Sequence, residues 1–375
     1  MKHQQHMKMK RPKKGFFSRI EISILGTNCE NIKNISNKIS KQIKQYISVT
    51  YVDKIHGNDD FNNHENLNFL NVYTDKISHH EYLLNKSSGS FEEHFFDSGN
   101  LTIINGNHNS GINQIVMIDQ TKKISLLKKK KNLTNVIAFI GKDLTVPDYI
   151  SDCIKNSQDI PFFLENDLVS ISSFITSFVS KQITPLNGLI LSGGESLRMG
   201  TNKAAIEYRG IPQHQHLNQL LKPFCDEVYV SCRKEQVHLF DNTIEDSFIG
   251  MGPTGGILSA FRKNPNVAWL SVACDIPLLN YDTILKLTKH RNPMKMATCF
   301  YNSTTKFPEP LITIWEPRAF SVLLYFLSQG YNCPRKALIN SEIEIVELDD
   351  ESVLLNSNTQ ENKKEVFEYL TRKNK

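Results

Sequence analysis

The sequence predicts an α/β protein built from two three-layer α/β/α domains, each with a mainly parallel sheet. Apolar runs of strand length alternate with segments of helical spacing through most of the 375 residues. A chain of this length is expected to form two domains with ample core. The polar stretch from Gln182 to Pro185 separates two such series. We therefore expect domains over 16–183 and 184–375, preceded by a disordered basic tail over 1–15.

The first half begins with a candidate strand over 20–25, which ends at a turn that starts with Gly26. Isoleucines then recur at helical spacing from Ile32 to Ile43. Further strands are expected at 49–52, 69–73, 101–104, 115–118 and 136–140. The segment 58–100 is rich in Asn and His and predicts long loops. Apolar residues between Leu168 and Phe178 predict an amphipathic helix.

The second half starts again with a short apolar strand over 186–191. Further strands are expected at 228–231, 268–273 and 311–315, and helical segments at 212–224, 257–261, 284–287 and 320–327. Near the C-terminus, Asn358 with Glu361 predicts a helix N-cap and its capping-box partner.

Composition excludes several classes of function. The net charge is only +5, and much of it lies in the N-terminal tail and in the run Lys128–Lys131, which we interpret as solvated. Basic residues are not interleaved with aromatic ones, so we expect no nucleic-acid partner. No apolar stretch approaches the ~18 residues of a membrane span. Seven cysteines without Cys-x-x-Cys spacing predict neither a disulfide framework nor a zinc site. The expected location is the cytoplasm.

The most informative segment is the glycine loop, which we define as residues 192–203. It follows the strand 186–191 and contains Gly193, Gly194, Arg198 and Lys203. Glycines let backbone N–H groups approach phosphate oxygens, and the two cations add charge to a polyphosphate. The spacing differs from a Walker A loop, because five residues separate Gly194 from Gly200 and Ala204 follows the lysine.

A carboxylate, Asp275, follows the apolar run 268–273 in the sequence Cys-Asp-Ile-Pro. A carboxylate at the end of a buried strand can hold Mg²⁺ on substrate phosphates. Many strands end in Asp before Pro for structural reasons alone, so Asp275 by itself is weak evidence of a metal site. The presence of the glycine loop in the same half of the chain strengthens the functional interpretation. The histidines of the first half fit no standard ligand spacing and indicate surface loops.

The glycine loop resembles the signature of the molybdenum cofactor guanylyltransferases, a nucleotidyltransferase family. That signature reads approximately Leu-x-Gly-Gly-x-Ser-x-Arg-Met-Gly-x-Asp-Lys, and only Asn202 departs from it, where the family has Asp. The resemblance covers about residues 184 to 372 and implies a Rossmann-like nucleotidyltransferase domain.

The resemblance also implies roles for individual residues. The catalytic residues would be Lys203, Arg198 and Asp275, with Asp275 also binding the metal. The nucleotide-binding residues would be Leu191, Ser192, Gly193, Gly194, Lys203, Asp246 and Asp275. The residues binding the pterin acceptor would be Arg335, Asn356 and Asn358. Gln360 stands where the family usually has Pro.

The implied reaction is transfer of GMP from GTP to molybdopterin carrying molybdenum, with release of pyrophosphate and with Mg²⁺ as the metal. Further implied partners are a molybdoenzyme or other proteins of cofactor synthesis. A cytidylyltransferase and a sugar-phosphate nucleotidyltransferase remain alternatives, although the two glycines after Ser192 favour GTP. A non-catalytic scaffold that binds or delivers the cofactor is the third alternative, and Asn202 is its support.

The first half resembles the adaptor GTPase that partners guanylyltransferase in cofactor synthesis, but without its phosphate loop. Asn31, Ile32 and Lys33 occupy the glycine, lysine and hydroxyl positions of that loop. We therefore expect a degenerate P-loop-like domain that does not hydrolyse GTP. It would bind the pterin cofactor, the partner domain or a target enzyme.

Overall fold

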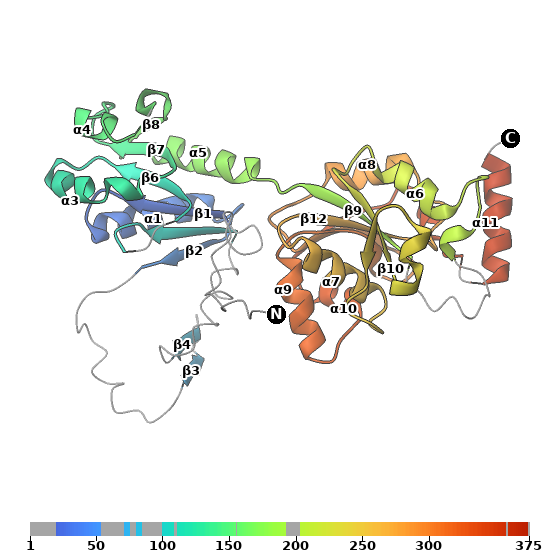
Figure 1. Cartoon of the computed structure of the whole chain (residues 1–375). Coiled ribbons are helices and arrows are strands. Elements are labelled where there is room, and N and C mark those ends of the chain that lie inside the picture. The colour runs from blue at the N-terminus through green and yellow to red at the C-terminus, as the bar shows by residue number, and fades with distance from the viewer. Residues whose placement is uncertain are drawn as a thin grey trace, which may run out of the picture. The chain divides into compact units, whose positions relative to one another are not determined.

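The computed structural model describes residues 20–53, 71–75, 80–84, 100–108, 111–154, 156–192, 203–357 and 359–373. The chain divides into two compact units, Met1–Gln182 and Ile183–Lys375 (Figure 1). Each unit is an α/β structure, so the expected fold class is confirmed. The tail expected over 1–15 lies outside the described residues.

The N-terminal unit is built on a six-stranded sheet in the order β2-β5-β1-β6-β7-β8. Every pair of neighbouring strands is parallel. The strands are β1 (Ile20–Leu25), β2 (Val49–Val52), β5 (Leu101–Asn105), β6 (Asn113–Met117), β7 (Val136–Gly141) and β8 (Phe162–Leu164). Because β1 lies in the middle and is buried over nearly its whole length, both sheet faces must be covered.

Helices cover the two faces of this sheet. Helix α1 (Cys29–Ile43) contacts β5 and α5 (Leu168–Lys181). On the opposite side, α3 (Lys123–Lys128) and α4 (Asp148–Ser151) contribute Leu126 and Ile150 to a cluster with Leu25, Val116 and Phe139. The result is a three-layer arrangement.

The region expected to form long loops also contains a two-stranded antiparallel sheet. Its strands are β3 (Asn71–Asp75) and β4 (His80–Leu84). The expected strand over 69–73 is therefore shifted by two residues, and β4 was not foreseen. The alternation of polar and apolar residues in β4 is short, and the surrounding sequence is rich in Asn and His. The pattern was therefore too weak to predict this strand.

The C-terminal unit has a seven-stranded sheet in the order β11-β10-β9-β12-β14-β13-β15. The strands are β9 (Leu186–Leu191), β10 (Val228–Cys232), β11 (Thr243–Glu245), β12 (Ala268–Ala273), β13 (Ala297–Asn302), β14 (Phe307–Trp315) and β15 (Ile343–Val346). All pairs are parallel except those made by β14, which runs antiparallel between β12 and β13. The start of β14 therefore lies at the edge where β12 ends.

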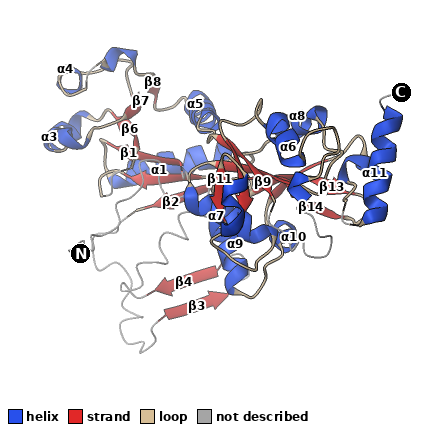
Figure 2. Cartoon of the chain, turned by 45° about the vertical axis from the view of Figure 1, so that its right-hand side comes forward, coloured by secondary structure: helices blue, strands red, loops and turns tan. Residues whose placement is uncertain are grey.

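Two layers of helices enclose this sheet, as Figure 1 and the turned view in Figure 2 both show. One layer holds α6 (Gln213–Leu221) and α8 (Tyr281–Lys289), whose Leu217 and Leu287 pack into a core with Ile190 and Leu270. The other holds α7 (Pro253–Lys263), α9 (Ala319–Ser328) and α10 (Pro334–Ile339). This second core contains both tryptophans of the chain, Trp269 and Trp315, which are fully buried.

The last helix, α11 (Gln360–Lys373), corrects one expectation about its start. The helix begins at Gln360, and the Thr359 hydroxyl accepts a hydrogen bond from the Asn362 N–H at 3.1 Å. Thr359 is thus the N-cap, while Asn358 lies outside the described residues. A threonine that follows an asparagine offers two capping candidates, and the sequence pattern selected the wrong one. Among the described helices, none is long and apolar enough to cross a membrane.

Candidate active site

The carboxyl ends of four parallel strands meet at one edge of the C-terminal sheet. From β9 the chain passes through α6 to β10 on one side, and later returns through α7 to β12 on the other. Such a reversal of direction opens a crevice beside the central strand, and ligands of open α/β sheets bind there. A cavity of about 170 Å³ lies at this edge. Its lining includes Leu191, Ser192, Ser231, Asp246, Gly252, Pro253, Gly256 and Asp275.

Ser192, the first residue of the glycine loop, lines this cavity at the end of β9. The buried Ser192 donates its hydroxyl proton to the Ser231 carbonyl at 2.7 Å, and its N–H bonds to the same oxygen at 3.1 Å. These bonds fix the start of the loop against β10. Gly193, Gly194, Arg198 and Asn202 lie outside the described residues. The backbone of Lys203 begins a short 3₁₀ helix over Lys203–Ala205.

Asp246 lies one residue beyond β11 and lines the same cavity. Its Oδ1 accepts a hydrogen bond from the Ser231 hydroxyl at 2.5 Å, and its N–H bonds to the Cys232 carbonyl at 2.9 Å. Burial raises the pKa of the Asp246 carboxyl, although Ser231 and the charge of Arg233 oppose the shift. A carboxylate held in such a place is stabilised by a ligand that donates hydrogen bonds or by a cation.

Helix α7 brings its positive end to the cavity. Gly252 has φ +57° and sits directly before the helix, and Pro253 occupies its first turn. A Cβ on Gly256 would lie 2.4 Å from the Ser231 hydroxyl oxygen and 2.8 Å from a Leu191 methyl carbon. Only glycine therefore permits the helix to approach β9 and β10 this closely. The N-terminus of a helix carries a partial positive charge, so the start of α7 beside this cavity favours an anionic ligand.

Asp275 links the residues predicted to bind the nucleotide to those predicted to bind the acceptor. It follows β12, and its carbonyl accepts a hydrogen bond from the Ser357 N–H at 2.9 Å. The Ser357 hydroxyl in turn accepts a bond from the Tyr208 hydroxyl at 2.6 Å. Burial, with a contribution from the charge of Asp275, raises the pKa of Tyr208, so the phenol keeps its proton. These bonds bring Asn356 and Ser357 beside the cavity from the far end of the sequence.

Asn356 presents an available acceptor at this place. Its Oδ1 is buried and has no hydrogen-bond partner among the described residues. A buried amide oxygen without a partner costs free energy of about 1–3 kcal/mol, so a ligand that donates a hydrogen bond there would recover it.

Arg335 reaches the same edge from the start of α10. Its Nε donates to the Pro308 carbonyl at 3.3 Å, and its Nη2 lies 3.7 Å from Oε2 of Glu309. Glu309 is buried, and burial raises the pKa of its carboxyl, with the charge of Asp275 adding to the rise. Glu309 thus links the neighbourhoods of Arg335 and Asp275. Sequence reasoning missed Glu309, although a charged residue between two prolines inside an apolar strand was the available signal.

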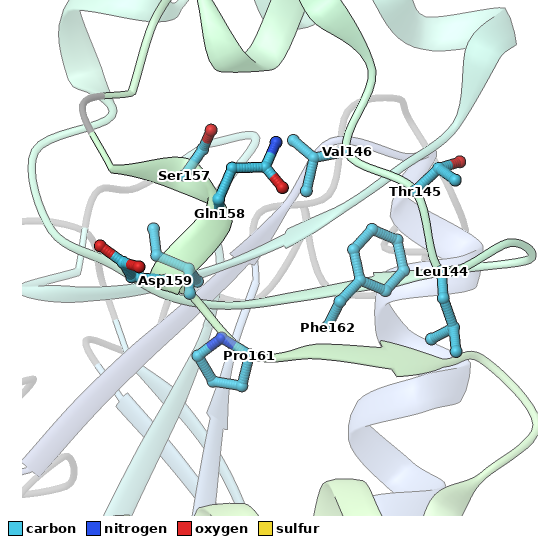
Figure 3. Close-up of a pocket in the computed structure, with 9 residues that line it drawn as sticks. Leu144, Thr145, Val146, Ser157, Gln158, Asp159, Pro161 and Phe162 are labelled. Atoms are coloured by element: carbon cyan, nitrogen blue, oxygen red, sulfur yellow. The ribbon is translucent and has the colours of Figure 1, made fainter.

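A separate cavity of about 570 Å³ lies in the N-terminal unit (Figure 3). Its lining includes Gln158, the Leu144–Val146 segment and the Phe162 ring, which lies beside that segment. Among the described residues, Asp159 is the one charged side chain in its lining.

The loop expected to replace a phosphate loop is a tight turn. Gly26 has φ +102°, and a Cβ there would lie 2.3 Å from the Met117 carbonyl oxygen. Asn28 caps α1 by accepting from the Asn31 N–H at 2.8 Å, and the helix starts at Cys29. Asn31, Ile32 and Lys33 therefore all lie within α1, and Ile32 is fully buried.

An open, mostly parallel sheet with carboxylates and a helix N-terminus at its switch point defines a class, the nucleotide-binding α/β domains. Residues 188–343 match the family model of the MobA-like NTP transferase domain. The C-terminal unit is therefore similar to MobA-like NTP transferase domains.

Two known proteins are similar to part of this chain. The chain is 35% identical over 182 residues to a molybdenum cofactor biosynthesis bifunctional protein of Synechocystis sp., covering 48% of this chain and 52% of that protein. It is 27% identical over 174 residues to a molybdenum cofactor guanylyltransferase of Pseudomonas putida, covering 44% of this chain and 88% of that protein. The chain thus spans about half the length of the Synechocystis relative.

A solved structure is also similar to this chain. It is molybdopterin-guanine dinucleotide biosynthesis protein A of Archaeoglobus fulgidus. The match has 20% identity and a TM-score of 0.43, and it covers 50% of this chain and 99% of that chain.

Proposed function

We propose that the C-terminal unit transfers GMP from GTP to molybdopterin carrying molybdenum and releases pyrophosphate. The observation that carries the proposal is the hydrogen bond between the Ser357 N–H and the Asp275 carbonyl. It joins the residues expected to bind the acceptor to those expected to bind the nucleotide. The match to the MobA-like NTP transferase domain supports the reaction class. The names of the relatives support the choice of acceptor.

The nucleotide side of the proposal rests on Ser192, Asp246 and the N-terminus of α7, which line one cavity. Lys203 and Arg198 are expected to stabilise the departing phosphates. Positioning and charge neutralisation carry most of the rate in phosphoryl transfer. The acceptor phosphate is already ionised at neutral pH, so the reaction needs no general base.

The carboxylates of Asp246 and Asp275 line the same cavity, and hard oxygen donors of this kind suit Mg²⁺. Asp275 is the proposed ligand. A bound Mg²⁺ would neutralise phosphate charge and act as a Lewis acid. In the acceptor half, Asn356 and Arg335 would orient the pterin through hydrogen bonds and charge.

The experiment that tests the proposal incubates the full chain with Mg²⁺, molybdopterin and α-labelled GTP. We expect label in a pterin dinucleotide together with one pyrophosphate per transfer. CTP in place of GTP tests the cytidylyltransferase alternative, and a sugar phosphate in place of molybdopterin tests the sugar-phosphate nucleotidyltransferase alternative. Binding of molybdopterin without transfer of label from any triphosphate would instead favour the cofactor-delivery scaffold.

For the N-terminal unit we propose a degenerate P-loop-like domain that does not hydrolyse GTP. Support comes from the tight turn at Gly26 and from the burial of Ile32, where a phosphate loop would place its lysine. Its contribution would be to bind the cofactor or a partner protein.

A further inference from the structure

Three neighbouring strands of the N-terminal sheet end in residues that form a cluster around a thiol. Cys29 is the first residue of α1, which follows β1, while His108 follows β5 and Asp53 follows β2. The Cys29 Sγ lies 3.2 Å from Nε2 of His108. The same nitrogen lies 4.0 Å from Oδ1 of Asp53. We call these three residues the thiol cluster.

Several hydrogen bonds hold the thiol cluster in place. Asp53 accepts from the Tyr51 hydroxyl at 2.8 Å and from Nδ2 of Asn105 at 2.8 Å. Burial raises the pKa of Tyr51, and the hydrogen bond to Asp53 and the charges of Asp53 and Cys29 add to the rise, so the phenol remains a donor. The side chains of His108 and Asp53 are only 12% and 23% exposed. The cluster is therefore preorganised rather than a chance encounter of surface groups.

This arrangement matches the requirements of nucleophilic thiol chemistry. The attacking species is the thiolate, and reactive cysteines occur at helix N-termini and beside histidine. A base within hydrogen-bond reach of the thiol is one part of the geometry of an activated nucleophile. Here Nε2 of His108 is the base. The Asp53 carboxylate, 4.0 Å from the same nitrogen, stabilises by its charge the imidazolium that forms.

We propose that Cys29 is a nucleophilic thiol, with His108 as its base, that reacts with small disulfides. Its sulfur attacks one sulfur of the disulfide while its proton passes to His108. The disulfide bond breaks, and the second sulfur leaves as a thiolate that takes up the proton. Cys29 is oxidised to a mixed disulfide, and the small disulfide is reduced to one thiol.

Disulfide exchange is the simplest reaction for this cluster. It needs only the thiolate and a proton acceptor, and Cys29 and His108 supply both. Beside the thiol, Nδ2 of Asn107 donates to the Thr27 carbonyl at 2.8 Å and lies 3.8 Å from the Cys29 Sγ.

The chain offers internal controls for a test, because all seven cysteines are free. Cys333 is exposed before α10, and Cys153 is half-buried in the same unit as Cys29 with its thiol bonded to the Tyr149 carbonyl at 3.2 Å. The full chain is exposed briefly to oxidised glutathione at neutral pH, and each cysteine is followed by peptide mass spectrometry. We expect Cys29 to react about tenfold faster than Cys333, because a positioned base accelerates proton removal.

Variants then test the role of each partner. His108→Gln should bring the rate of Cys29 to that of Cys333 or below it, while the rates of Cys333 and Cys153 stay unchanged. Asp53→Asn, which keeps the shape of the side chain, should lower the Cys29 rate by a smaller factor. Circular dichroism checks the fold of both variants. If His108→Gln does not fold, the proposal is tested by the Asp53→Asn variant and by the comparison of the Cys29 and Cys333 rates in the unmodified chain.

Iodoacetamide provides a second probe that separates two parts of the proposal. Fast alkylation of Cys29 with slow reaction toward oxidised glutathione would overturn the disulfide as its substrate. A Cys29 rate no greater than that of Cys333 with both probes would overturn the nucleophile itself. A Cys29 rate that His108→Gln leaves unchanged would overturn the role of His108.

Discussion

The two units build the same kind of sheet edge from different residues. In the C-terminal unit, β9 and β11 end at one cavity, which is lined by Ser192 and the half-buried Asp246. In the N-terminal unit, β1 ends at Gly26 in a tight turn, and the residues beyond it bring together Cys29 and His108. Both edges lie at the carboxyl ends of parallel strands. The chemistry is therefore set by the few residues after each strand and not by the sheet.

The sharpest test of this difference removes the charge partners of the C-terminal edge. Asp275→Ala and Lys203→Ala should each lower guanylyl transfer by about 10²-fold or more, because such residues act on charge that develops in the transition state. Turnover is measured at saturating GTP, with Asp241→Asn on the exposed surface of the same unit as the control. If both variants were as active as the unmodified chain, the assignment of Asp275 and Lys203 to the active site would be wrong.

A second test separates the nucleotide side of the edge from the acceptor side. Asn356→Ala and Arg335→Ala should raise KM for molybdopterin by about tenfold, the effect of losing a hydrogen bond to a buried or charged group. KM for GTP should change little. The neighbouring exposed Lys336→Ala serves as a control, since its ammonium packs on Tyr331. Equal losses for both substrates would contradict the division between acceptor and nucleotide.

A third test concerns the glycine that the C-terminal edge requires. Gly256→Ala should destabilise the C-terminal unit by about 1–3 kcal/mol, because the added methyl group overpacks the contact with Ser231 and Leu191. It should also weaken GTP binding. The exposed Asp241→Asn is again the control. Both tryptophans lie in the C-terminal unit, so tryptophan fluorescence during urea unfolding follows this unit alone. Unchanged stability and GTP affinity would show that α7 can move away without loss.

A fourth test uses a histidine of the C-terminal unit. Burial and the charge of Arg209 lower the pKa of His216 from 6.5 to about 4. Between these values the unfolded chain binds a proton that the folded unit does not, so stability should fall as the pH drops from 6.5 to 4. The loss is at most about 1 kcal/mol per pH unit. His216→Gln should flatten this part of the profile, measured by tryptophan fluorescence in urea. Identical profiles for both proteins would contradict the lowered pKa.

Deletion of the N-terminal unit should have the smallest effect on the rate of guanylyl transfer. A fragment of residues 184–375 should retain guanylyl transfer at a rate similar to the full chain, because the proposed site lies entirely after Gly188. A fragment of residues 1–183 should not hydrolyse GTP, since Asn31, Ile32 and Lys33 replace the groups that hold phosphate and Mg²⁺. Release of phosphate from GTP by the second fragment would reveal a phosphate site that the turn at Gly26 does not suggest.

Much of the architecture was accessible from local pattern. The strands over 49–52 and 268–273 were predicted with their observed bounds, because apolar runs of strand length leave few alternatives. The short edge strands β11 and β15 were missed, since three or four residues carry too little periodicity. The roles of Asp246 and Asp275 stay predictions, but their shared cavity follows from a general rule, namely that parallel strands end at one edge.

The sequence by itself determined the α/β alternation, the glycine loop after Leu191 and the carboxylate after β12, because each depends on residues adjacent in the chain. Only the tertiary structure decided which distant segments meet. Glu309 reaches the edge beside Asp275 because β14 runs antiparallel between β12 and β13. Ser357 meets Asp275, and His108 meets Cys29, across 82 and 79 positions in the sequence. Strand order fixes such contacts, and it is settled by packing the whole sheet rather than by any local pattern.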